Sequence, residues 1–188
     1  MEISNALLVA MMFIVLLTMA IGSIITALAV TVDRRSHLKF DALHTSWMLL
    51  LLLLCFNLFW HVLDILSIES WQFLDFLYII AGAVVILFAS HVLVPDASSE
   101  SSSDLRRHYY EVAPQFFIFL ALAQAWVLGV DFVFGGDFTL QGALNIVAGL
   151  TFVILATSRS QMVHVTGTVV SWLLFLTAMT IQTLGQGA

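Results

Sequence analysis

The chain alternates between long apolar stretches and short polar connections. A helix needs about 20 mostly apolar residues to cross a membrane, because the hydrocarbon core is about 30 Å thick and each residue rises about 1.5 Å. Six stretches are long and apolar enough: 6–32, 45–66, 73–94, 114–134, 138–158 and 165–184. Lipid offers no water to unpaired backbone groups, and the sequence lacks the alternating pattern of barrel strands. We therefore expect an all-α polytopic membrane protein in which residues 1–188 form one domain of six transmembrane helices.

The composition excludes a soluble enzyme. Of the 188 residues, 61% are apolar and 10% are charged, and the mean hydropathy is +1.05. Soluble domains have about 45–50% apolar and about 25% charged residues. The sequence also lacks a nucleophile elbow, an H-E-x-x-H motif and a phosphate-binding loop. We expect a protein that is not an enzyme and that, with a net charge of -6, does not bind nucleic acid.

The charged residues are sorted by side. All basic residues follow the first, third and fifth stretches: Arg34, Arg35, Lys39, Arg106, Arg107 and Arg159. The opposite ends of the stretches carry acids: Glu2, Asp64, Glu69, Asp75, Asp131 and Asp137. Because basic connections stay in the cytoplasm, the sequence predicts a protein of the cell (inner) membrane with both termini on the non-cytoplasmic side.

The connections predict how the helices are joined. The outer connections are short, which favours three antiparallel hairpins. The connection 95–111 is rich in Ser and predicts a flexible cytoplasmic loop, whose last part, 105–111, forms an interfacial turn. Pro114 then lies in the first turn of the fourth helix, where a missing amide hydrogen is harmless.

A spacing of small residues recurs along the chain and indicates an internal repeat. The residues are Gly22 and Ala29, Gly82 and Ala89, and Gly149 and Ala156. The offset between the last two pairs also places Asn57 on Gln124 and Asp64 on Asp131. The match indicates either duplicated helix pairs or the small-residue bias of apolar helices. In both cases we expect these positions to serve helix packing.

Polar residues inside the apolar stretches are the candidate transport residues. Asn57, His61 and Asp64 are spaced to share one helix face, and Gln124 and Asp131 share a face of the fourth helix. One interpretation is an outward-facing vestibule in which carboxylates attract a cation and His61 moves a proton. The other is that the aspartates reach the outer interface while the amides hold helices together.

The remaining histidines lie near the opposite, cytoplasmic ends: His37, His44, His91, His108 and His164. Their depth pairs His44 with His91, and paired histidines can hold haem or a metal. No His-x3-His spacing occurs within one helix. We therefore expect no cofactor and no metal, and keep a His44–His91 site as the less favoured alternative.

Two functions of different classes follow from these features. The first is a homo-oligomeric channel or transport unit for protons or another cation, with an acidic outward-facing vestibule. The second is a non-catalytic sensor, scaffold or accessory subunit of a larger membrane complex. The expected partners are the lipid bilayer and either further copies of the chain or a partner membrane protein. The first predicts that the polar faces meet in one space, and the second that they point separately to the rim.

Overall fold

The computed structural model describes residues 5–33, 41–66, 68, 71–95, 104–133 and 139–185. Their regular elements are the helices α1 (Asn5–Asp33), α2 (Ala42–Trp60), α3 (Val62–Leu66), α4 (Phe73–Leu93), α5 (Leu105–Val133), α6 (Leu140–Thr157) and α7 (Gln161–Gly185). The short α3 continues α2, so the described residues contain six helices long and apolar enough to cross a membrane. The predicted all-helical fold is confirmed for the described residues, and its six long helices match the number of predicted spans.

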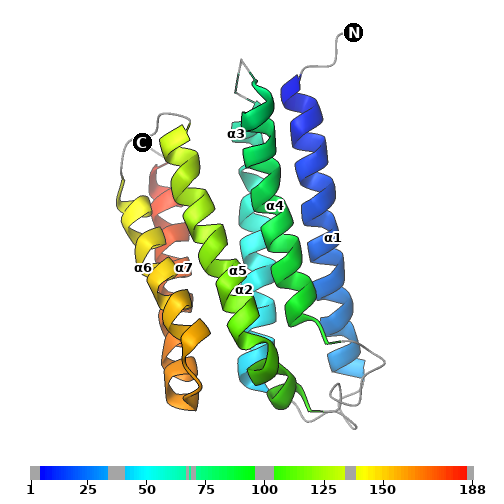
Figure 1. Cartoon of the computed structure of the whole chain (residues 1–188), viewed down its shortest axis with the longest axis vertical. Helices are drawn as coiled ribbons and strands as arrows, with labels where there is room; N and C mark the ends of the chain where they lie inside the picture. The colour runs from blue at the N-terminus through cyan, green and yellow to red at the C-terminus, as the bar shows by residue number, and fades with distance from the viewer. Residues whose placement is uncertain are drawn as a thin grey trace.

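The helices form a bundle in which α2 is central (Figure 1). It contacts α1, α4, α5 and α7, while α5 packs between α4 and α6. The start of α1 and the end of α7 lie at the same end of the bundle (Figure 1). Consecutive spanning helices contact each other, with α2 and α3 taken as one, but α1 also packs extensively along α4. The three hairpins and the internal repeat therefore stay predictions.

Charge distinguishes the two ends of the bundle. Arg106, Arg107 and Arg159 lie where α5 begins and α6 ends, and we call this the arginine end. Asp64 and Asp75 lie at the opposite end, which we call the acidic end. The other basic residues, Arg34, Arg35 and Lys39, are outside the described residues.

The fourth spanning helix begins earlier than the sequence predicts. Residues 105–111 form the first turns of α5 and not an interfacial turn, and Pro114 lies inside the helix. The Asp104 carboxylate accepts the backbone N–H of Arg107 at 3.2 Å, as an N-cap does. Arg107 also pairs with Glu111 one turn later, with 2.8 Å between Nε and Oε1. These local interactions stabilise a polar helical extension that hydropathy alone does not detect. Residues 96–103 of the predicted loop are outside the described residues.

The second spanning helix is interrupted at His61. Its start is capped by Asp41, whose carboxylate accepts the Leu43 N–H at 2.7 Å. At the other end α2 stops at Trp60, and the backbone N–H of Asp64 bonds to the His61 carbonyl three residues back. This three-residue turn is tighter than a turn of α-helix. It divides the predicted continuous helix into α2 and α3 and orients His61 and Asp64 toward each other.

Helices α4 and α5 are held together by an unusually close contact at Gly82. A Cβ at this position would overlap the indole ring of Trp126. That indole donates to the Tyr78 carbonyl, and the Tyr78 hydroxyl donates back to the Trp126 carbonyl, both at 2.8 Å. Glycine is therefore required at position 82 for the two backbones to approach.

The other small residues differ in their packing. Ala89 is fully buried, Ala156 packs against the core, and Gly149 lies against Gln124. The structure does not place a packed neighbour at Gly22, which is exposed with open space around it, and Ala29 is also exposed. The packing role predicted for this first pair is therefore wrong within one chain.

Candidate functional site

A cavity of about 600 Å³ opens among α2, α3, α5, α6 and α7. Asn57, His61 and Asp64 line it from α2, α3 and the turn between them, and Gln124 lines it from α5. The sequence-predicted polar faces of these helices thus meet in one space. The backbone of Asp131 belongs to α5, but its side chain is outside the described residues.

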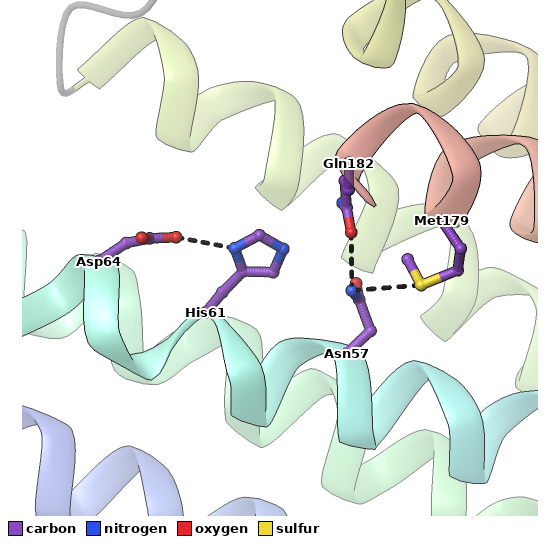
Figure 2. A network of polar contacts seen from close by, with 5 residues as sticks. All are labelled: Asn57, His61, Asp64, Met179 and Gln182. Atoms are coloured by element: carbon purple, nitrogen blue, oxygen red, sulfur yellow. Dashed lines mark hydrogen bonds and ion pairs between the residues drawn. The ribbon is translucent and has the colours of Figure 1, made fainter. Parts of the chain in front are cut away.

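Asn57 connects α2 to α7 across the cavity. Its Nδ2 donates to Oε1 of Gln182 at 3.1 Å and lies 3.6 Å from the sulfur of Met179 (Figure 2). Buried amides in an apolar helix need such partners, because an unpaired polar group is costly away from water. The pair places two amide groups on opposite walls of the cavity.

His61 and Asp64 form the polar mouth of the cavity at the acidic end. His61 Nδ1 donates to Oδ2 of Asp64 at 2.7 Å (Figure 2). The side chains of His61 and Asp64 are 38% and 75% exposed. The Asp64 side chain is therefore the more exposed of the two at the mouth.

Further polar residues line the cavity that the sequence reasoning missed: Gln141, Asn145, Ser171 and Gln182. The rule that singled out Asn57 and Gln124, an amide inside an apolar stretch, applies equally to Asn145 and Gln182. In addition, Oε1 of Gln124 and Oε1 of Gln141 are buried with no hydrogen-bond partner among the described residues. Neither oxygen is reachable by a water-sized molecule, so each is an acceptor in the cavity wall that lacks a donor among the described residues.

The cavity is closed toward the arginine end by an aromatic floor. Trp47 is 1% exposed, and its ring meets those of Phe117 and Phe152 edge to face at 4.8 and 6.0 Å. The Trp47 indole donates to the hydroxyl of Thr168 on α7 at 2.9 Å. Ser171 is the lining residue of α7 that lies nearest this floor.

A buried histidine lies beyond the floor, next to Phe117. His164 is fully buried, and its Nε2 donates to the Ser158 carbonyl at 3.0 Å. Its Nδ1 therefore accepts the hydroxyl of Tyr109, at 2.8 Å. This arrangement satisfies both ring nitrogens of His164 and joins α5 to α7 at the arginine end.

The histidine pairing expected from depth is wrong. His44 contacts His108, with 5.7 Å between ring centroids, and each donates from Nε2 to the Leu93 carbonyl at the end of α4. His91 is exposed, and its Nδ1 bonds to the Leu87 carbonyl one turn earlier in its own helix. His44 thus bonds to α4 and contacts α5. His44 and His108 together satisfy the carbonyl at the end of α4.

The described residues contain no cluster of three or more histidine, cysteine or acidic side chains that could hold a metal. His37 is outside this part of the chain.

No protein-family model, no curated protein and no solved structure matches this chain. Its function is therefore argued from the geometry of the cavity and from the charges at the two ends of the bundle.

Proposed function

We propose that this chain is a transport protein, not an enzyme, that moves a proton or another cation across the membrane through the cavity. The observation that carries the proposal is the convergence of polar side chains from four helical elements on one space. Asn57, His61, Asp64 and Gln124 line the same cavity, and Gln182 faces Asn57 across it. Polar groups inside transmembrane helices are costly, and they commonly mark the path of a substrate or ion.

The charge of the cavity favours a cation. Asp64 supplies a carboxylate at the mouth, and none of the described lining residues is Lys or Arg. The amide oxygens deeper in the cavity are further ligands for a positively charged group. A carboxylate at an aqueous mouth raises the local concentration of cations before they enter.

The aromatic floor favours transport by alternating opening over an open channel. Trp47 and Phe152 close the cavity toward the arginine end. In such a mechanism one end of the cavity closes before the other opens, so the ion gradient is not short-circuited. We infer that the arginine end faces the cytoplasm, which makes the cavity outward-facing and puts both termini outside.

The experiment is cation flux in liposomes reconstituted with the purified chain. Proton uptake under an imposed membrane potential is followed with an entrapped pH-sensitive dye, and potassium and sodium uptake with isotopes. Asp64→Asn and Asp131→Asn remove the acidic groups predicted at the mouth, and Asp75→Asn is the matched control at the same end. We expect uptake above empty vesicles that falls in the first two variants and persists in the control.

Uptake equal to empty vesicles for every cation, organic cations included, would refute the transport proposal and leave the accessory-subunit alternative. All residues that line the cavity belong to one chain, so the cavity does not require a second copy. We therefore propose the homo-oligomer separately from the transport function. It is checked by measuring the mass of the purified protein in detergent by light scattering.

A further inference from the structure

The walls of the cavity are unsuited to a bare inorganic ion. Between the mouth and the floor, α2 contributes Leu50, Leu51 and Leu54, and α7 contributes Leu174 and Phe175. A small ion passing these side chains would lose its water without gaining ligands in return. An organic molecule with an apolar body would instead gain free energy by leaving water for the same walls.

The polar groups of the cavity are suited to a positively charged hydrogen-bond donor. Gln124 and Gln141 line the cavity, and their amide Oε1 atoms have no hydrogen-bond partner among the described residues. Asp64 adds a negative charge at the mouth, and no Lys or Arg lies among the described lining residues. An ammonium group supplies both the N–H donors and the charge that these acceptors require.

We propose that the cavity binds an amphipathic organic ammonium ion, with its charged head between Asp64 and the glutamines and its apolar body directed toward Trp47. The cavity volume of about 600 Å³ is within the usual range for sites that enclose molecules of drug-like size. The indole of Trp126 also lines the cavity. This inference rests on the proposed function and names its substrate class.

Binding is tested with three ligands that share one apolar body. These are 1-naphthylmethylammonium, the neutral 1-naphthylmethanol and the anionic 1-naphthylacetate, titrated calorimetrically into the chain in lipid nanodiscs at neutral pH, with empty nanodiscs subtracted. We expect the ammonium to bind at least about tenfold more tightly than the acetate, with the alcohol between them, because only the head group differs. Asp64→Asn should weaken ammonium binding about three- to tenfold, the modest effect of a water-exposed charge.

The controls separate this site from other binding. Asp75→Asn removes a carboxylate at the same end that does not line the cavity, and it should leave the affinities of all three ligands unchanged. Ala178→Phe fills the cavity and should abolish binding of the ammonium. Equal binding of the three ligands by the unmodified chain would overturn the inference in favour of a cavity for lipid chains. Ammonium binding that survives both Asp64→Asn and Ala178→Phe would also overturn it.

Binding and flux distinguish this inference from the function on which it rests. Saturable ammonium binding without uptake of any cation, including isotope-labelled 1-naphthylmethylammonium, would refute transport and keep the ligand class. Uptake of protons or metal cations without ammonium binding would keep transport and refute the ligand class.

Discussion

The hydroxyl of Tyr109 provides a sharp test of how the arginine end is closed. Tyr109 and His164 are both fully buried, and the Tyr109 hydroxyl donates to His164 Nδ1 at 2.8 Å. Tyr109→Phe removes the donor and leaves a buried acceptor unpaired. A hydrogen bond contributes about 0.5–1.5 kcal/mol to stability, and a buried group left unpaired costs about 1–3 kcal/mol. Hydrogen bonds within membrane bundles lie at the low end, with an average of about 0.6 kcal/mol. We expect a loss of about 1.5–2.5 kcal/mol in the free energy of unfolding.

The neighbouring Tyr110 is the matched control. Its hydroxyl is buried with no hydrogen-bond partner among the described residues. Tyr110→Phe should therefore leave the free energy of unfolding unchanged or raise it slightly. Both variants are measured by equilibrium unfolding in mixed detergent and dodecyl sulfate micelles, followed by tryptophan fluorescence. Equal destabilisation by the two variants, within about 0.3 kcal/mol, would refute the buried Tyr109–His164 bond as the source of the difference.

Other predictions concern the cavity wall, the helix contacts and the orientation. A double-mutant cycle with Asn57→Leu and Gln182→Met should give a coupling of about 0.5–1 kcal/mol in the same unfolding assay, and zero coupling would contradict their bond. Gly82→Val should cost about 1–3 kcal/mol, because it overlaps the indole packed there, whereas Gly22→Val should cost under about 0.5 kcal/mol. A cysteine at Arg159 should react with a membrane-impermeant maleimide in inverted vesicles and not in intact cells, and the reverse result would invert the orientation.

The spanning helices could be predicted because the ability of a segment to cross a membrane depends on its own residues. The stretch 73–94 and the helix Phe73–Leu93 differ by one residue at one end, because the transfer of apolar side chains into lipid depends on composition alone. The start of α5 could not be read in that way. Residues 105–111 are polar, and only the Asp104 cap and the Arg107–Glu111 pair indicate that they are helical.

The cavity could be predicted only in part, because the partners of a helix face depend on how the whole bundle packs. The spacing of Asn57, His61 and Asp64 predicted a shared face, but nothing local indicates that Gln182 lies opposite. The same reason explains the error at His44. Depth alone favoured His91, whereas the packing of α5 beside α4 brings His108 to the Leu93 carbonyl that His44 also binds.

The hydrogen bonds between helices are distributed unequally along the bundle, and this bears on how transport would work. Among the described residues, four side-chain hydrogen bonds join α7 to α2 and α5 toward the arginine end. They are Trp47–Thr168, Trp172–Ser46, Tyr109–His164 and Arg106–Gln161. At the acidic end, Asn57 joins α2 to α7 through two bonds, to Gln182 and to the sulfur of Met179. At about 0.6 kcal/mol each, the difference of two bonds is roughly 1 kcal/mol.

That difference corresponds to a factor of about 5–10 in favour of opening the acidic end. A bound substrate can reverse this preference only if it binds the alternate state more tightly by at least the same factor. An ammonium head that pairs with Asp64 and the free glutamine oxygens would draw α3, α5 and α6 together at the mouth. The contacts that recognise the substrate would then also supply the free energy needed to close the acidic end and release α7 from Trp47.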